Sequence, residues 1–321
     1  MTPPTLCVAL CTYNGSAFLP EQLESVAGQS RPPDRVVVVD DTSTDTTLQL
    51  LERFAGSVSF PVEIRVNERN LGFSKNFERA IAHSQGEVIV LSDQDDVWHP
   101  EKLARIEAAF GRSPAIGLVF SDAELVDAAL RPLGYRLWEA VQLSAEMQAE
   151  IESGRLFELL VRGNFVTGAT LAFRSEWREL VLPVETCSVH DAWLALLIAA
   201  VSDAALIPEP LICYRQHASN QMGMRKTHAL ERLARGRRVG QRDLTWHAAH
   251  LRAARERLAG YPGISRARLE YIQDAIAHLA VRTALPKSRI RRVPAISQEL
   301  LRGRYRRLAN GGWSALRDFL I

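Results

Sequence analysis

Short runs of valine, isoleucine and leucine alternate with amphipathic segments through the first 120 residues of the chain. The apolar runs lack the polar alternation of a half-exposed sheet, which predicts a parallel sheet with helices on both faces. The expected strands are Leu6–Thr12, Arg35–Val39, Val62–Val66, Glu87–Ser92 and Ile116–Ser121.

Start and stop signals for helices lie between these strands. Strand and helix therefore alternate as βαβαβαβ, which predicts a doubly wound α/β fold. In such a fold the ligand crevice lies at the carboxyl ends of the strands. The expected helices run from Ser16 to near Gly28, from Ser43 or Thr44 to about Phe54, from Ser74 to Gly86, and from Pro100 onward.

The second half of the chain has a looser pattern that ends in helices. Arg155–Val161 and Val189–Val201 are expected to be helical, and the apolar runs in NFVTGATLAFR and LICYRQH predict two further strands. The longest apolar run, Ala192–Val201, has about half the length that a membrane-spanning helix needs, which indicates a core helix. From Thr227 we expect one helix after another, interrupted at Gly236, Gly240, Gly260, Pro286, Pro294 and Gly311-Gly312.

Charge divides the chain at about residue 225. The net charge of +2 combines 17 Lys/Arg and 30 Asp/Glu in residues 1–224 with 22 Lys/Arg and 7 Asp/Glu from Arg225 onward, a balance of −13 against +15. The length of 321 residues suits two folded parts. We therefore expect an α/β domain in residues 1–225 and a basic, helical C-terminal region in residues 226–321.

The cysteines and the N-terminal sequence predict a cytoplasmic protein. Cys7 and Cys11 fall on one face of a strand, and Cys187 and Cys213 lie far from them, so neither a disulfide framework nor a zinc site is indicated. MTPPTLCVAL lacks the basic segment and apolar segment of a secretion signal. Peripheral attachment to the inner face of the cytoplasmic membrane is the alternative location.

Three carboxylates follow the strand at Glu87–Ser92, namely Asp93, Asp95 and Asp96 in SDQDDVW. Like charges this close raise one another's pKa, and a divalent cation would remove the repulsion because hard ions take carboxylate ligands. If the alternation of the strand persists, Asp93 and Asp95 point the same way and could face one cation. A solvated acidic turn is the competing interpretation.

The other early strands also end in polar motifs, which are CTYNGS, DDTSTDTT and NERNLGFSKN. Because the carboxyl ends of parallel strands share one rim, these motifs indicate a binding site. Neither a Walker motif nor GxGxxG is present, so a glycine-rich loop does not hold phosphates here. A nucleotide could instead be held by Asp40 or Asp41 and by a cation on its phosphates, which would make a diphosphate a better leaving group.

The motifs ALCTYNG, VVVVDDTSTDTT, NLGFSKNFERA and SDQDDVW occur in the order and at about the spacing of family-2 glycosyltransferases. The chain resembles that family, whose members have the GT-A fold, over roughly residues 5–225. With YRQHASNQMG downstream it is most similar to bacterial rhamnosyltransferase-type members, which build O-antigen and other surface polysaccharides. Such enzymes bind a nucleotide-sugar through the first two motifs and a divalent metal through a DxD motif.

The resemblance implies a nucleotide site at the first three motifs. Asp41 would accept a hydrogen bond from the pyrimidine N3 edge, and Asp40 would support the turn. Lys75 or Asn76 would lie near the nucleotide or its phosphates, although the family commonly has Arg where Lys75 stands. The base and ribose would contact Cys11, Thr12 and Tyr13.

The resemblance also implies a metal site. Mg²⁺ or Mn²⁺ would bind Asp93 and Asp95 of the DxD motif. His217 would reach the metal or the diphosphate, with Arg215 beside it, although a histidine in this place also suits a solvated strand end. Asp96 would contact the donor sugar or support the metal ligands.

Three further residues receive roles near the sugars. Gly168 in VTGAT would let the backbone approach the donor sugar closely, with a simple turn glycine as the competing interpretation. Trp98 would pack under the acceptor. Asp191 in HDAW lies where the family carries its general base, although a carboxylate at a helix start is commonly only a cap. His190 replaces an acidic residue of the family motif, and we expect it to titrate near neutrality and tune Asp191.

Together these features predict a metal-dependent, inverting glycosyltransferase. It would move L-rhamnose from dTDP-rhamnose, or a sugar from a UDP-sugar, onto a saccharide or lipid-linked saccharide in O-antigen or exopolysaccharide biosynthesis. A sugar-phosphate nucleotidyltransferase is the enzymatic alternative, but Tyr13-Asn14-Gly15 supplies no phosphate loop of that kind. A non-catalytic, nucleotide-binding, membrane-associated protein is the other alternative, against which the retained carboxylates speak.

The basic C-terminal region has three interpretations. RGRYRRLANGGWSALRDFL interleaves arginine with leucine, tryptophan and tyrosine, which is typical of helices that lie on an anionic membrane. A structural helical cap and a homodimer interface are the other two. Aromatic residues are few and no RNA-binding motif appears, so we expect no nucleic-acid partner.

Overall fold

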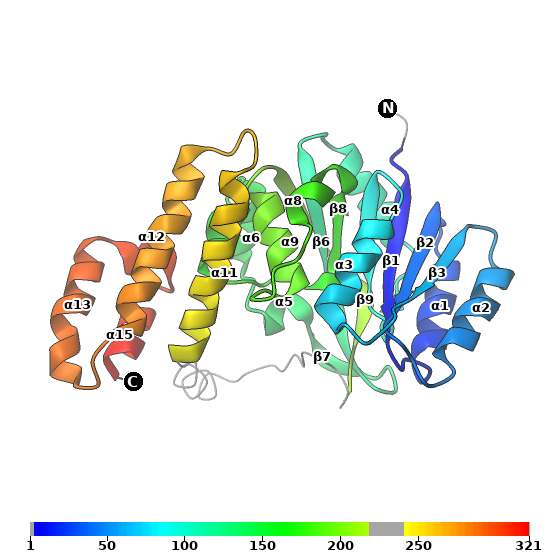
Figure 1. Ribbon diagram of the computed structural model, residues 1–321, viewed down its shortest axis with the longest axis horizontal. Helices are drawn as coiled ribbons and strands as arrows, with labels where there is room; N and C mark the ends of the chain where they lie inside the picture. Colours follow the sequence, from blue (N-terminus) through cyan, green and yellow to red (C-terminus); the bar gives the residue numbers. More distant parts are fainter. Residues whose placement is uncertain (1–2, 218–240, 321) are drawn as a thin grey trace. The chain divides into compact units, whose positions relative to one another are not determined.

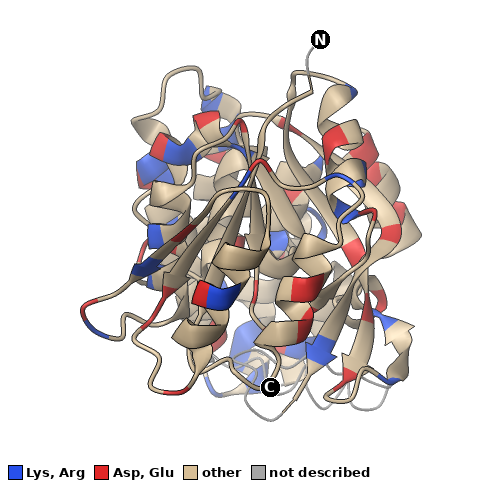
Figure 2. Cartoon of the chain, turned by 90° about the vertical axis from the view of Figure 1, so that its right-hand side faces the viewer, with Lys and Arg blue, Asp and Glu red and all other residues tan. Residues whose placement is uncertain are grey.

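The structure is a computed structural model that describes residues 3–217 and 241–320 (Figure 1). It divides into two compact units, each of which is considered by itself. Unit 1 comprises residues 1–154, 165–184 and 189–226, and unit 2 comprises residues 155–164, 185–188 and 227–321. Acidic positions are spread over the helices of unit 1 that face the viewer in Figure 2, in agreement with the negative charge of the first 224 residues.

The first four expected strands form the parallel half of the sheet in unit 1. Their order is β3-β2-β1-β4, and all their neighbouring pairs are parallel. In this register Thr12 lies beside Asp40, and Asp40 lies beside Val66, so the carboxyl ends finish at one edge. The strands are β1 (Leu6–Thr12), β2 (Arg35–Asp40), β3 (Val62–Val66) and β4 (Val88–Ser92).

The rest of the sheet departs from the simple parallel order that we expected. β8 (Leu171–Arg174) is inserted antiparallel between β4 and β6 (Ile116–Asp127), which continues beyond the expected end at Ser121. β9 (Asp203–Gln216) runs parallel to β6, and β5 (Val97–Trp98) and β7 (Pro132–Arg136) add antiparallel edges. As a result the end of β9 reaches the edge where β4 ends.

Three of the four helices in the first half begin later than their sequence signals. α1 (Leu19–Ala27) and α4 (Lys102–Gly111) start after Ser16 and Pro100, respectively. α2 (Thr47–Ser57) starts at Thr47 because the Asp45 carboxylate accepts from its N–H at 3.0 Å. α3 (Phe73–His83) ends before Gly86 and packs on β1 and β2. The GT-A type α/β fold is nevertheless confirmed, with a mixed, mainly parallel sheet flanked by helices.

The second half of unit 1 contains short helices around one buried helix. α9 (His190–Ala199) is apolar on all sides and packs on α3 and β6, so it is the core helix that the sequence predicts. In residues 3–217 and 241–320 no helix is both long and apolar enough to cross a membrane. The short helices are α5 (Leu137–Ala140), α6 (Ala145–Glu152), α8 (Arg178–Val181), η1 (Gly168–Thr170) and η2 (Ser175–Trp177).

Unit 2 is helical, as the sequence predicts for its C-terminal part. The expected interruption at Pro294 is wrong, because Pro294 lies inside α13 on an exposed side of the helix. Burial of Ile296 and Glu299 holds this helix together in spite of the hydrogen bond that a proline cannot donate. Gly236 and Gly240 lie outside the described residues. The helices are α7 (Leu156–Arg162), α11 (Gln241–Ala259), α12 (Arg266–Thr283), α13 (Arg289–Leu301), α14 (Arg304–Leu308) and α15 (Gly312–Leu320).

Candidate active site

The acidic turn after β4 lies at the carboxyl edge of the sheet. The strand ends at Ser92, and the chain bends at Gln94 and Asp95, so the strand alternation that we expected to align Asp93 with Asp95 does not persist. The two carboxylates are nevertheless close. Burial raises the pKa of Asp93, and the negative charges of Asp95 and Asp191 raise it further. The turn and the start of α9 therefore contribute carboxylates to one site.

The end of β9 brings His217 to this turn. Its Nε2 lies 2.8 Å from Oδ2 of Asp95, and its ring lies against Phe18 with the ring centroids 4.5 Å apart. The two residues are 122 positions apart in the chain and meet only because β9 runs parallel to β6 toward the same edge. The structure thus brings together two of the three predicted metal ligands by direct contact, with Asp93 in electrostatic range.

The donor groups at this turn fit a divalent cation that shares its coordination with a diphosphate. Repulsion between Asp93 and Asp95 is the condition that a bound cation relieves. Among the residues that the structure describes, no three His, Cys, Asp or Glu side chains form a complete metal cage. Mg²⁺ is commonly held by one or two carboxylates with substrate phosphates supplying further oxygens, and this arrangement matches that pattern.

Asp191 lies in the first turn of α9 and is half-buried. Its Oδ1 accepts from the N–H of Ala192 at 2.5 Å, and its Oδ2 accepts from the N–H of Gly168 at 3.3 Å. Burial raises the pKa of Asp191 to about 6, although the two hydrogen bonds act in the opposite direction. A carboxyl group with this pKa is largely ionised at neutral pH and can still accept a proton, which suits a general base.

His190 differs from our expectation that it titrates near neutrality. Burial lowers the pKa of His190 to about 3, so the imidazole is neutral. The ring stacks on Phe77 with centroids 4.1 Å apart, and neither ring nitrogen has a hydrogen-bond partner among the described residues. A Cβ on Gly168 would lie 2.6 Å from Nε2 of His190. The close approach that requires glycine at position 168 is therefore to this ring.

The segment Cys11–Tyr13 supplies one wall of the predicted nucleotide site. Tyr13 is 46% exposed at the end of β1, so its ring is available for stacking. Burial, followed by the nearby carboxylates of Asp93 and Asp41, raises the pKa of the Cys11 thiol well above its usual range. Cys11 therefore lies between the predicted nucleotide site and the predicted metal site.

Asp40 and Asp41 brace the loops around that wall. Both oxygens of Asp40 accept hydrogen bonds, from Thr12 Oγ1 at 2.7 Å and from Ser43 N–H at 2.7 Å. The Asp41 carboxylate accepts from Asn67 Nδ2 at 2.7 Å and from two backbone N–H groups, those of Leu71 and Gly72, each at 2.8 Å. Asp40 thus supports the turn, and Asp41 fixes the loop 67–72 beside the predicted base.

Two other predicted binding residues, Lys75 and Asn76, form hydrogen bonds within the protein. Asn76 donates to the carbonyl of Val39 at 2.9 Å, and Lys75 Nζ donates to Glu78 and to the Val184 carbonyl at 2.7 and 2.8 Å.

Arg215 is 1% exposed and donates to the backbone carbonyl of Asp95 at 2.7 Å, to the carbonyl of Ala128 at 2.6 Å and to the Glu21 carboxylate. Its backbone N–H donates to Asp96 Oδ1 at 3.0 Å. Arg215 therefore stabilises the acidic turn through its contacts with Asp95 and Asp96.

Sequence reasoning missed Gln94, Lys102 and Tyr214. The Gln94 amide bonds to the backbone of Tyr13. Lys102 is fully buried and donates to the Ala169 carbonyl at 2.8 Å. Its Nζ lies 3.9 Å from the ring centroid of Trp98, and Trp98 is 3% exposed. Burial lowers the pKa of Lys102, and only the adjacent carboxylates oppose this.

Tyr214 lies among the acidic groups of the site. Burial raises the pKa of Tyr214 well above its usual range, and Asp93, Asp96, Asp95 and Asp191 add to this effect in that order. Its hydroxyl therefore stays protonated and can donate a hydrogen bond to an acidic group. The motif YRQH contained the signal, whereas Lys102 lies in an ordinary amphipathic pattern that gave none.

Comparison with known proteins shows what this chain is similar to. Residues 7–150 match the model of Glycosyl transferase family 2. The matched region includes the acidic turn and the three nucleotide-site motifs, while Asp191 and His217 lie beyond it.

Relatives in sequence extend the similarity beyond the matched region. An uncharacterized glycosyltransferase of Nostoc sp. is 27% identical over 222 residues, which cover 67% of this chain and 66% of the relative. The dTDP-rhamnosyl transferase RfbG of Shigella flexneri is 27% identical over 229 residues, covering 67% of this chain and 73% of the relative. The chain thus spans about two thirds of the Nostoc relative's length.

Solved structures share the fold. TarS 1-349 of S. aureus in complex with UDP-GlcNAc has a TM-score of 0.59 at 17% identity, covering 98% of this chain and 88% of that chain. The mannosyltransferase PcManGT of Pyrobaculum calidifontis, in complex with GDP-Man and Mn²⁺, has a TM-score of 0.56 at 19% identity, covering 100% and 86%. At these identities the likeness concerns the fold.

Proposed function

We propose that this protein is a glycosyltransferase that moves a hexose from a nucleoside diphosphate sugar to a saccharide hydroxyl, with inversion at the anomeric carbon. The observation that carries the proposal is the position of Asp191. Its carboxylate is held by two backbone N–H groups and is close enough to Asp93 to raise the pKa of that residue. A proton acceptor and the acidic turn therefore belong to one site.

The transfer needs one bond formed and one broken at the anomeric carbon. The acceptor oxygen bonds to that carbon while Asp191 takes the hydroxyl proton. The bond from the same carbon to the diphosphate oxygen breaks, and its electron pair leaves with the nucleoside diphosphate. Because the attack comes from the face opposite the leaving group, the configuration inverts. A general base of this kind contributes about 10²–10⁴ in rate.

Asp93 and Asp95 would hold Mg²⁺ or Mn²⁺, and His217 would orient Asp95 through its hydrogen bond. When bound, the cation would neutralise charge on the departing diphosphate. The Tyr13 ring would stack on the base, with Cys11 and Thr12 behind it. Asp41 would accept from the base edge, since a carboxylate has more lone pairs than the donors that now contact it.

We propose L-rhamnose from dTDP-rhamnose as the donor, on the basis of the relative from Shigella flexneri, with a UDP-sugar as the second candidate. The acceptor would be a saccharide or a lipid-linked saccharide in the synthesis of O-antigen or another surface polysaccharide. A relative from Bacillus subtilis described as a putative teichuronic acid biosynthesis glycosyltransferase, 28% identical over 32% of this chain, supports a surface polymer.

A donor screen tests the proposal. The full-length protein is incubated with dTDP-L-rhamnose, UDP-glucose, UDP-GlcNAc or GDP-mannose, each with Mn²⁺, Mg²⁺ or EDTA, and release of nucleoside diphosphate is measured. We expect release from one donor class, and only with a divalent ion. Equal release with EDTA would contradict the metal site. Release of pyrophosphate from a nucleoside triphosphate and a sugar phosphate would instead identify a nucleotidyltransferase.

A further inference from the structure

The last helices of unit 2 bury polar residues on their inner sides. In α13 the buried residues are Arg292, Ile296 and Glu299, which are spaced to lie on one side of a helix. In α15 they are Ser314, Ala315 and Asp318. An ordinary surface helix buries mainly its apolar side, whereas these two helices bury charged residues beside Ile296 and Ala315.

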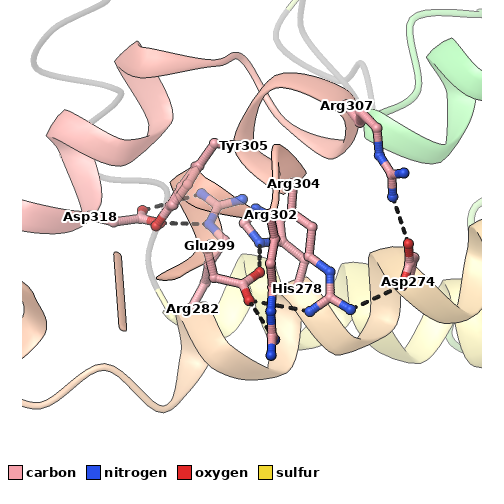
Figure 3. Close-up of polar contacts among 9 residues, drawn as sticks. All are labelled: Asp274, His278, Arg282, Glu299, Arg302, Arg304, Tyr305, Arg307 and Asp318. Carbon is pink, nitrogen blue, oxygen red and sulfur yellow. Dashed lines mark hydrogen bonds and ion pairs between the residues drawn. The ribbon is translucent and has the colours of Figure 1, made fainter. Parts of the chain in front are cut away.

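The buried polar groups are paired with one another (Figure 3). Arg282 donates to both carboxylate oxygens of Asp318, at 2.6 and 3.2 Å, and the hydroxyl of Tyr305 donates to the same group at 2.8 Å. Glu299 lies 2.6 Å from Nδ1 of His278 and accepts from Arg304 at 3.2 Å. Because these carboxylates are neutralised internally, they contribute little negative potential at the surface.

The outer sides of the same helices carry exposed apolar side chains. On α13, Ile290 is 83% exposed and Leu301 90%, and their spacing places them opposite Arg292 and Glu299, whereas Val293, 45% exposed, lies at the side of the helix. On α15, Trp313 is 70% exposed and Leu316 47%. α13 and α15 pack against each other. Contiguous exposed apolar side chains are typical of binding surfaces.

The exposed charged residues of the segment 286–320 are all basic. Within residues 286–320, all of which the structure describes, no Asp or Glu is exposed, since Glu299 and Asp318 are buried. Arg302 and Arg307 pair with acidic groups, whereas the other four have no carboxylate partner among the described residues. The exposed basic residues of this segment are Lys287, Arg289, Arg291, Arg302, Arg306 and Arg307.

We propose that residues 286–320 form a docking face for an anionic lipid surface. Aliphatic and tryptophan side chains would enter the interfacial region of the bilayer, and the arginines would contact acidic headgroups. Charge separates this partner from a second copy of the chain, because two such faces would oppose like charges. The aliphatic character separates it from RNA, which is contacted chiefly by aromatic and polar groups. This proposal does not depend on the transfer reaction.

Vesicle flotation of the full-length protein tests the proposal. Point variants are used because residues 155–164 and 185–188 fold with the C-terminal helices in unit 2, so a truncation would disturb that unit. Vesicles of phosphatidylcholine alone are compared with equimolar phosphatidylcholine and phosphatidylglycerol, at 50 mM and 500 mM salt. We expect binding to the anionic vesicles only, and weaker binding at the higher salt concentration.

Two sets of variants separate charge from apolar contact. Arg289→Gln with Arg291→Gln is expected to weaken binding about 30-fold, about fivefold for each charge removed. Its control is Arg53→Gln with Arg112→Gln, which changes exposed arginines of unit 1. Leu301→Ser is expected to weaken binding about tenfold. Leu133→Ser, at a residue 40% exposed in β7, is its control and should bind as the wild type does.

Tryptophan fluorescence of the wild-type protein provides a second, independent measurement of binding. On anionic vesicles the Trp emission should shift to shorter wavelength and be quenched by brominated lipid, and Trp313→Phe should remove most of that change. Equal binding to neutral and anionic vesicles, or unchanged binding of both surface variants, would overturn the proposal. So would a dimer that Leu301→Ser dissociates in sedimentation velocity, or retention on RNA without retention on vesicles.

Discussion

The side-chain amide of Gln94 pairs with both backbone polar groups of Tyr13, accepting from its N–H at 2.8 Å and donating to its carbonyl at 3.1 Å. Gln94 lies between Asp93 and Asp95, so this pair ties the end of β1 to the acidic turn. It also explains Gly15, where a Cβ would lie 2.2 Å from Oε1 of Gln94. Tyr13 of the predicted nucleotide site and the predicted metal ligands Asp93 and Asp95 are thus held at a fixed spacing.

Gln94→Ala is therefore expected to weaken nucleotide binding about tenfold. It removes two hydrogen bonds that contribute about 1 kcal/mol each, and part of this loss appears as misplacement of Tyr13. Isothermal titration with the nucleoside diphosphate and Mn²⁺ measures the effect. Gln49→Ala, at an exposed glutamine of α2, is the control. Unchanged affinity in Gln94→Ala would show that the pair does not position the site.

The metal assignment predicts that nucleotide stabilises the fold only together with a divalent ion. At nucleotide 100-fold above its Kd, the melting temperature should rise by about 5 °C with Mn²⁺ and should not change with EDTA. Asp95→Asn should lose most of this rise, whereas Asp203→Asn, at an exposed position at the start of β9, should keep it. A rise of the same size in EDTA would contradict the assignment of Asp93 and Asp95.

The fit between Gly168 and His190 predicts a coupled effect on stability. Gly168→Ala should destabilise the protein by about 1–3 kcal/mol, because the new Cβ would meet Nε2 of His190. His190→Ala removes that obstacle but leaves a cavity. The free energy of unfolding from urea titrations should therefore fall by less in the double variant than the sum of the two single changes. Strict additivity would indicate that the glycine serves another contact.

The raised pKa of Asp191 predicts a pH-dependent stability effect of Asp191→Asn. The native group binds its proton up to a pKa of about 6, whereas an unfolded aspartate loses it near 4. Between these values the native state binds more protons, so this group makes the wild type less stable as the pH rises through that window. Asparagine at position 191 does not titrate, so it contributes no such dependence of stability on pH.

The melting temperature of Asp191→Asn relative to the wild type should therefore increase by several degrees between pH 4.5 and 7.5 in EDTA. Asp203→Asn provides the control, since that carboxylate is exposed. A constant difference between Asp191→Asn and wild type across this range would show that Asp191 is solvated like an ordinary surface aspartate.

The sequence predicted the parts of the fold that depend on local patterns. Runs of β-formers such as Leu6–Thr12 and Val62–Val66 became strands at the expected residues, the first fully buried and the second partly exposed at the edge of the sheet, because such runs are a local signal. The antiparallel insertion of β8 between β4 and β6 was not predictable, since pairing between strands far apart in sequence leaves no local pattern. Motif order predicted a similarity to family-2 glycosyltransferases, and residues 7–150 match the model of that family.

For the site, sequence could predict where carboxylates gather and could not predict how each polar group is satisfied. Asp95 and His217, which the resemblance implied as ligands of one metal, lie within hydrogen-bond distance of each other. Arg215 and Lys75, by contrast, use their charges on internal partners that no motif reveals. His190 was expected to titrate near neutrality. The sequence could not reveal that His190 is buried against Phe77, because this burial depends on how α3 packs against α9.

The proton-accepting role of Asp191 is the central claim, and single-turnover transfer by Asp191→Asn tests it most directly. The variant keeps the size of the side chain and one acceptor for the N–H groups of Ala192 and Gly168, but it cannot take a proton. With the donor found in the screen, it should bind nucleotide and metal within about twofold of wild type and lose about 10²–10⁴ in transfer rate. The product of the wild type should have inverted anomeric configuration. Transfer by Asp191→Asn within tenfold of the wild-type rate, or a product with retained configuration, would contradict the account.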